Sequence, residues 1–176
     1  AYAAAADSKP MPSGRKAYRA LADYEWDMKE LAKRNPDLVK LITLPHKTAI
    51  MAWLDEVDAV ARDVGAVNTV VREGDHLRGT NTDAEGFIRP LKNKFGDLAA
   101  AKAAVIGAGG AARACIYSLL KEKAKVTVFA RDTRTAEALA ADFAIPIRQI
   151  GDVDTFEEFD IVVNTTPVGT KGKSVN

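Results

Sequence analysis

Short apolar runs alternate with helix-like segments in the second half of the chain, and this alternation predicts a β/α arrangement with a parallel sheet. The run AARACIYSLL, which starts at Ala111, has apolar residues at helical spacing and predicts a helix. A second helix is predicted within Thr133–Phe143, over Ala136–Phe143. Apolar stretches predict four strands at Ala103–Ile106, Lys125–Ala130, Pro146–Ile150 and Asp160–Val163. The first two strands and the helix between them fit one βαβ unit.

The first half has a mixed pattern of short strands and helices. Gly65 ends a helix predicted over Asp55–Val64, and Gly96-Asp97 ends another over Ala84–Phe95. The runs Ala66–Arg72 and His76–Thr80, joined by a glycine turn, predict a β-hairpin. Weaker patterns indicate a strand at Lys40–Leu44, a helical segment reaching Trp53 and Leu54, short helices at Lys16–Leu21 and Lys29–Arg34, an extended Tyr24–Asp27, and poor order over residues 1–15. We place a domain boundary between residues 95 and 96.

A glycine turn follows the strand Ala103–Ile106. Gly107, Gly109 and Ala112 form a G-x-G-x-x-A pattern between a strand and a helix. The free N–H groups at Gly109–Ala111 and the positive end of the helix dipole suit an anion such as a pyrophosphate. The alternative is a doubly wound sheet in which the glycines serve only tight packing.

Charged residues follow the strand Lys125–Ala130, where dinucleotide-binding folds recognise the ribose. Arg131 and Arg134 suit a 2′-phosphate, because a guanidinium binds a phosphate through two parallel hydrogen bonds. Asp132 lies between them and could pair with Arg131 or accept a ribose hydroxyl. The sequence favours NADP over NAD, and a solvated charge cluster is the structural alternative.

The loop Asn164–Gly169 follows the strand Asp160–Val163. Ligands of open α/β sheets lie beyond the carboxyl ends of the strands, so this polar loop can line the nicotinamide side of a dinucleotide. A plain surface loop is the other interpretation.

Composition narrows the partners. The 176 residues carry a net charge of +1, which gives no reason to expect binding to nucleic acid or to a membrane surface. The one cysteine, Cys115, cannot form an internal disulfide; it fits a buried position and a cytoplasmic, reducing compartment. No Cys/His cluster offers a metal site.

Three polar clusters follow buried-looking strands in the first half. They are Thr43 with His46-Lys47, Asn68-Thr69, and Asn81-Thr82-Asp83. Taken singly, each charge could be a solvated surface group. Together they offer hydroxyl, amide, ammonium and carboxylate groups, which a small polyhydroxy acid would need.

These clusters and the glycine turn resemble the shikimate dehydrogenase family, which includes shikimate and quinate dehydrogenases. The matching motifs are TLPHK (Thr43–Lys47), GAVNT (Gly65–Thr69), GTNTDAEGF (Gly79–Phe87), GAGGAARA (Gly107–Ala114) and NTTPVG (Asn164–Gly169). The resemblance implies a smaller α/β substrate-binding (catalytic) domain over residues 1–95 and a Rossmann-like, doubly wound NADP-binding domain over residues 96–176. Both domains are expected to be incomplete.

The resemblance also implies a function: the reversible NADP-dependent reduction of 3-dehydroshikimate to shikimate in aromatic amino-acid biosynthesis. Lys47 and Asp83 fall on the catalytic pair, and Thr43, Asn68 and Asp83 on substrate-binding positions. The cofactor would be held by Gly107, Ala108, Gly109, Gly110 and Ala111 at its pyrophosphate and by Arg131 at its 2′-phosphate. Further cofactor-binding residues are Ala130, Arg134, Thr165, Thr166 and Val168. We expect a packing role for His46 and a monomer or homodimer.

Two departures from the family keep alternatives open. The family's Ser-x-Ser motif is not matched by Ser8 or Ser13, and its glycine-rich carboxyl-terminal part is missing, so we expect a partial chain. One alternative is an NAD-dependent quinate/shikimate dehydrogenase. The other is a nucleotide-binding module without catalytic activity.

Overall fold

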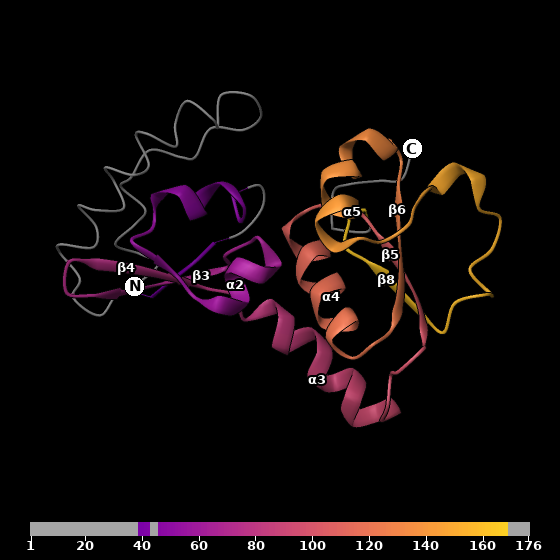
Figure 1. The fold of residues 1–176 in the computed structure, drawn as a ribbon, viewed down its shortest axis with the longest axis horizontal. Coiled ribbons are helices and arrows are strands. Elements are labelled where there is room, and N and C mark those ends of the chain that lie inside the picture. The colour runs from indigo at the N-terminus through magenta and orange to yellow at the C-terminus, as the bar shows by residue number, and fades with distance from the viewer. Residues whose placement is uncertain (1–38, 43–45, 169–176) are drawn as a thin grey trace.

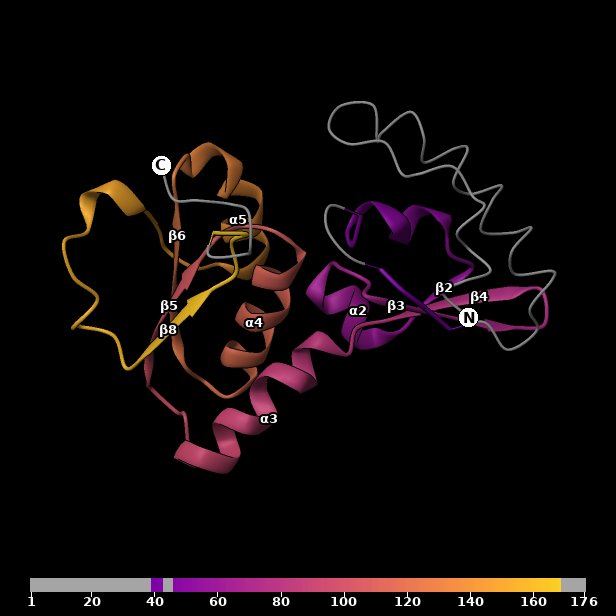
Figure 2. The same cartoon turned by 180° about the vertical axis from the view of Figure 1, so that it is seen from behind.

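Two four-stranded sheets organise residues 39–42 and 46–168, which the computed structural model describes. Figures 1 and 2 show them as two lobes, with α3 running from the first lobe along the second. In the first lobe the elements are β1 (Val39–Leu41), the 3-10 helix η3 (Ala49–Trp53), β2 (Glu56–Val57), α2 (Ala59–Val64), β3 (Thr69–Glu73), β4 (His76–Thr80) and α3 (Asp83–Phe95). In the second they are β5 (Lys102–Ile106), α4 (Gly110–Lys121), β6 (Lys125–Ala130), η4 (Thr133–Thr135), α5 (Glu137–Phe143), β7 (Ile147–Gln149), η5 (Ile150–Asp152) and β8 (Ile161–Asn164).

The first sheet has the strand order β1-β3-β4-β2. The predicted hairpin is confirmed, because β3 and β4 pair antiparallel from Thr69↔Thr80 to Glu73↔His76. The predicted end of α2 is also confirmed: Gly65 has a left-handed backbone, with φ of 69°, and its N–H bonds to the carbonyls of Ala61 and Arg62.

The helix predicted over Asp55–Val64 is wrong at its start. Glu56 and Val57 form β2, which pairs parallel with β4, and the helix begins only at Ala59. The carboxylate of Asp58 accepts a hydrogen bond from the N–H of Ala61 and so caps α2. Pairing with a strand 22 residues away overrides the local helical pattern, which the sequence alone does not reveal.

The second sheet is parallel throughout, in the order β7-β6-β5-β8. This is the 3-2-1-4 order of a Rossmann-like fold, and it confirms the predicted α/β class. The direction of strand addition reverses between β5 and β8, which places the ligand crevice of such sheets at their carboxyl ends. The helix expected within Thr133–Phe143 divides into η4 and α5, since Asp132 caps the short 3-10 turn.

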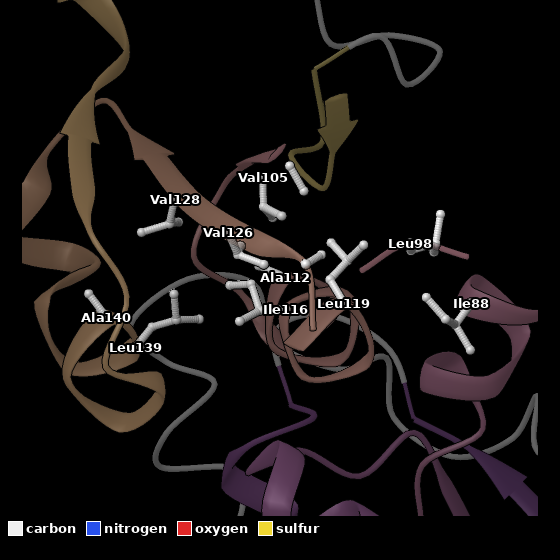
Figure 3. Packing of buried hydrophobic residues seen from close by; sticks show 12 residues of the cluster. Ile88, Leu98, Val105, Ala112, Ile116, Leu119, Val126, Val128, Leu139 and Ala140 are labelled. Atoms are coloured by element: carbon white, nitrogen blue, oxygen red, sulfur yellow. The ribbon is translucent and has the colours of Figure 1, made fainter. Parts of the chain in front are cut away.

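The core of the second lobe includes residues from α3. Figure 3 shows Ile88 of α3 and Leu98 beside Leu119 of α4, in one cluster with Ile116 and Val126. The Ser118 hydroxyl of α4 also donates a 2.9 Å hydrogen bond to the carbonyl of Ala84. The boundary between residues 95 and 96 stays a prediction, but the last helix before it packs into the second core.

Several expectations lie outside the described residues. They concern residues 1–15, Lys16–Leu21, Tyr24–Asp27, Lys29–Arg34, Thr43 and the end of the strand predicted over Lys40–Leu44. Within the described part of the chain, α3 is the longest helix at 13 residues, and no helix there is long and apolar enough to cross a membrane.

Candidate active site

Lys47 and Asp83 form an ion pair between the segment before η3 and the first residue of α3. The Lys47 Nζ lies 2.5 Å from the Asp83 Oδ2, with the two side chains 14% and 34% exposed. Thirty-six residues separate them in sequence, so the pair is a contact of the tertiary fold. A partly exposed ammonium–carboxylate pair can bind a hydroxyl and exchange a proton with it.

Asn68 holds Asp83 from the other side. Its Nδ2 donates to the Asp83 Oδ1 at 2.7 Å and to the Thr82 Oγ1 at 2.9 Å. Its Oδ1 accepts from the Thr82 N–H and from the Thr69 hydroxyl, both at 2.9 Å. The buried amide therefore fixes the start of α3, and Asp83 is fixed at both carboxylate oxygens.

The glycine turn of the second lobe lies directly beneath Lys47. A Cβ at Gly110 would stand 2.8 Å from the Lys47 Cβ and 3.2 Å from its Cδ. Gly110 is the first residue of α4, and no side chain caps the helix at Gly109. The ion pair of the first lobe therefore lies next to the uncapped N-terminus of α4. This is the arrangement expected when a substrate site adjoins an anion site.

The loop after β8 flanks the same turn. A Cβ at Gly107 would meet the Thr165 Oγ1 at 2.6 Å, and that hydroxyl donates to the Ile106 carbonyl at 2.7 Å. The Thr166 hydroxyl donates to the Asn164 Oδ1 at 2.7 Å, and the Val168 carbonyl accepts from the Asn164 amide at 3.4 Å. The structure brings Thr165 and Thr166 to Gly107, at the switch point of the sheet.

The charged residues after β6 are arranged as a pair and a separate arginine. The Arg134 Nε and Nη2 lie 3.2 and 3.1 Å from the two carboxylate oxygens of Asp132. These hydrogen bonds hold the pKa of Asp132 below its usual range. Arg131 is exposed, and its guanidinium has no bonded partner within residues 39–42 and 46–168. Asp132 is thus compensated by Arg134 and leaves Arg131 accessible.

Cys115, on α4, is buried close to the ion pair. Burial raises the pKa of its thiol to about 11, with the Asp83 carboxylate raising it further and the Lys47 ammonium opposing. We expect iodoacetamide at pH 8 to modify the native thiol at least about 100-fold more slowly than in the unfolded chain, because the reactive thiolate is scarce and covered. Mass spectrometry of alkylated protein measures both rates; equal rates with and without denaturant would contradict the buried placement.

Sequence reasoning found the pair and the glycine turn, named Asn81 in a polar cluster without giving it a role, and missed Arg113. Asn81 is buried; its Nδ2 donates to the Ala66 carbonyl and its Oδ1 accepts from the Ala84 N–H. Arg113 bonds to the Val64 carbonyl of the first lobe. A single arginine in the apolar run AARACIYSLL was the available signal for Arg113.

Comparisons with known proteins point to one family. A sequence model described as "Shikimate dehydrogenase substrate binding domain" matches residues 39–70, and one described as "Shikimate / quinate 5-dehydrogenase" matches residues 90–171. The shikimate dehydrogenase (NADP(+)) of Salinibacter ruber is 48% identical over 140 residues, covering 73% of this chain and 49% of that protein.

Solved structures agree with these matches. Shikimate dehydrogenase of Aquifex aeolicus superposes with a TM-score of 0.78 at 34% identity, covering 90% of this chain and 57% of that one. Shikimate 5-dehydrogenase of Thermus thermophilus, in complex with NADP(H) and shikimate, gives 0.72 at 35% identity, covering 89% and 56%. The chain spans about half the length of the curated relatives it matches. On both sequence and fold, the chain belongs to the shikimate/quinate dehydrogenase family.

Proposed function

We propose that the protein carrying this chain catalyses the reversible NADP-dependent reduction of 3-dehydroshikimate to shikimate, in aromatic amino-acid biosynthesis. The observation that carries the proposal is the Lys47–Asp83 ion pair, 2.5 Å long, directly above Gly110 at the N-terminus of α4. A proton-transfer pair and a dinucleotide turn then face one another, as a hydride-transfer reaction requires.

The residues of the glycine turn fit the cofactor. The first turn of α4 has no side-chain cap, so its N–H groups can receive the pyrophosphate. Gly107, Ala108, Gly109 and Ala111 expose backbone there, and Thr165, Thr166 and Val168 would line the nicotinamide side. When bound, the cofactor supplies the hydride acceptor or donor at its nicotinamide ring.

Lys47 would exchange a proton with the substrate oxygen. In reduction, the ammonium of Lys47 would give a proton to the alkoxide oxygen and become the neutral amine. In oxidation, that neutral amine would take the proton from the substrate hydroxyl as the carbinol carbon loses a hydride. Asp83 accepts hydrogen bonds from Lys47 and Asn68, so it orients the ammonium and offers a carboxylate edge to a substrate hydroxyl. Both amide hydrogens of Asn68 already donate hydrogen bonds, to Thr82 and Asp83. Asn68 would therefore bind the substrate only by giving up one of these two hydrogen bonds.

The charges after β6 favour NADP over NAD. Asp132 is bound by Arg134, and a carboxylate held in this way is a poor acceptor for a ribose hydroxyl. Arg131 is the exposed cation at the end of the strand that contains Ala130, where a 2′-phosphate would lie. Arg134 would add its charge to the same anion while it compensates Asp132.

Replacing Arg131 with alanine is therefore expected to raise the KM for NADP by about 10- to 100-fold, the range of a lost charge-assisted hydrogen bond. The KM for NAD should change little, because NAD lacks the 2′-phosphate. Steady-state kinetics with both cofactors measure the ratio. An equal rise for both would mean that Arg131 acts on the fold or on a shared part of the cofactor.

The function itself is tested with purified protein, shikimate or quinate, and NADP or NAD, by following the ultraviolet absorbance of the reduced nicotinamide. Turnover with shikimate and NADP supports the proposal. A preference for quinate with NAD would support the quinate/shikimate dehydrogenase alternative, which the family description includes. Tight NADP binding without shikimate binding would instead identify an inactive nucleotide-binding module. A cytoplasmic location belongs to the same proposal, since Cys115 is a free thiol and reduced thiols persist in that compartment.

A further inference from the structure

Arg113 of α4 connects the two lobes. Its Nε donates a 2.7 Å hydrogen bond to the carbonyl of Val64, the last residue of α2, and its Nη2 lies 2.5 Å from the Asp142 Oδ2 of α5. The guanidinium also lies 5.4 Å from the ring centroid of Phe143. The side chain is only 15% exposed, so these contacts hold a largely covered cation between α2 and α5.

Gly65 marks how closely the first lobe approaches this guanidinium. A Cβ at Gly65 would stand 2.5 Å from the Arg113 Nη2, 2.8 Å from its Nε and 2.9 Å from its Cζ. The residue also has a φ of 69°, which disfavours most side chains. The backbone after α2 therefore passes directly along the guanidinium; the conformation favours glycine, and the contact leaves no room for a Cβ.

The segment that begins at Gly65 supports both members of the ion pair. The N–H of Val67 donates a 2.7 Å hydrogen bond to the carbonyl of Lys47. One residue later, the Asn68 amide donates to the Asp83 Oδ1 at 2.7 Å. Residues 64–68 thus form a continuous chain of contacts from Arg113 to Lys47 and to Asp83.

The charge of Arg113 suits this position for two reasons. A cation near the end of α2 is favourable because the last carbonyls of a helix carry its negative partial charge. The Asp142 carboxylate compensates the guanidinium on its other side. The planar guanidinium can direct Nε and Nη2 to two different acceptors at once, which a lysine ammonium does less well.

We propose that Arg113 is a positioning residue for hydride transfer: it anchors the segment 64–68, and through it Lys47 and Asp83, to the helix whose N-terminus receives the cofactor. This inference rests on the proposed function of the Lys47–Asp83 pair. Arg113 touches neither partner of the reaction. Its contribution is to fix the distance between the Lys47–Asp83 pair and Gly110. The rate of a pre-aligned reaction depends steeply on such a distance.

The test compares Arg113→Met with Arg148→Met. Arg148 makes matched contacts within the second lobe alone: a 2.8 Å ion pair with Glu158 and a 5.4 Å approach to the ring of Phe129. We expect Arg113→Met to lower kcat for shikimate about 10- to 100-fold, with the Kd for NADPH, measured by its fluorescence, nearly unchanged. Arg148→Met should leave kcat near that of the wild type. Equal kcat in the two variants, or a parallel loss of NADPH affinity, would overturn the proposal.

Hydrogen exchange gives a readout that does not depend on turnover. In Arg113→Met, the amides of residues 64–69 should exchange at least about tenfold faster than in Arg148→Met, because the segment loses its anchor. If the wild type shows no shikimate oxidation, the proposed function fails, while the exchange data still decide whether Arg113 anchors the segment. Unchanged exchange in an active enzyme would refute the anchoring role alone.

A second variant guards against misfolding of Arg113→Met. Asparagine tolerates the left-handed backbone of Gly65, but its Cβ would collide with the guanidinium. Gly65→Asn should therefore lower kcat relative to the wild type. Added to Arg113→Ala, it should lower kcat much less relative to Arg113→Ala alone. Strictly additive effects of the two substitutions would mean that the residues are not coupled and would contradict the proposal.

Discussion

Replacing Lys47 with methionine is expected to lower kcat for shikimate oxidation by about a hundred- to ten-thousand-fold, the usual contribution of a positioned general acid–base group. Methionine keeps an unbranched stem above Gly110 and removes only the ammonium that is 2.5 Å from Asp83. NADP binding should persist, because the proposed pyrophosphate site uses backbone N–H groups at the start of α4 and not the Lys47 side chain. The measurement is kcat together with the Kd for NADPH in the same preparation.

Lys92→Met is the matched control for this substitution. Lys92 of α3 also pairs with a carboxylate on a neighbouring segment, Glu122, at 2.8 Å, but it lies at the far end of α3 from Asp83. Removing it takes away a comparable surface contact and no part of the site, so kcat should stay unchanged. A Lys47→Met enzyme as active as Lys92→Met would remove Lys47 from the mechanism.

The second large effect is expected for Gly110→Ala, which should lower kcat about 10- to 100-fold through displacement of Lys47. The new methyl group would stand 2.8 Å from the Lys47 Cβ, an atom fixed to the backbone that cannot swing aside. Local helix propensity alone predicts that the same substitution raises the unfolding free energy, since alanine in a helix is more favourable than glycine by about 0.5–1 kcal/mol. A lower kcat in a protein of undiminished helix content and unchanged Kd for NADPH would therefore report the contact itself.

Gly86→Ala separates the effect of helix propensity from the effect of the contact with Lys47. Gly86 lies inside α3, and a Cβ there would meet no atom within 4 Å. This variant should gain about 0.5–1 kcal/mol in unfolding free energy, as expected for an open helical site, and keep its activity. Denaturant titration and kcat, measured on both glycine variants, give the comparison. Full activity of Gly110→Ala would show that the approach of Lys47 to α4 is not needed for turnover.

Much of the second lobe could be predicted because its signals are local. The strand at Lys125–Ala130 was predicted with its observed bounds, since a β-branched run between a helix and a charged turn leaves little choice. The end of α2 at Gly65 followed from a single residue type. By contrast, β2 was missed because its pairing with β4 is set by distant residues, and the helical spacing of Val57 with Val60 and Val64 was misleading.

For the candidate site, the structure brings together residues that the sequence had named, while their roles stay predictions. Family resemblance named Lys47 and Asp83, and the geometry places them in contact. The role of Arg113 could not be read from the sequence, because its acceptors are 49 and 29 residues away. The approach of Gly110 to Lys47 was equally hidden: the glycine motif accounts for that residue by the cofactor alone, and nothing in the pattern indicates a lysine 63 residues earlier in the chain.

The shared helix α3 ties the ion pair of the first lobe to the core of the second. Asp83 begins a helix whose Ile88 is embedded in the second core, whereas Lys47 is tied by its own carbonyl to Val67 of the first lobe. Asn68 of the first lobe also holds Asp83, through a 2.7 Å hydrogen bond. If the lobes were to hinge apart, either Asp83 would leave Asn68 and Lys47 or Ile88 would leave the second core, so these contacts coexist only in the closed arrangement.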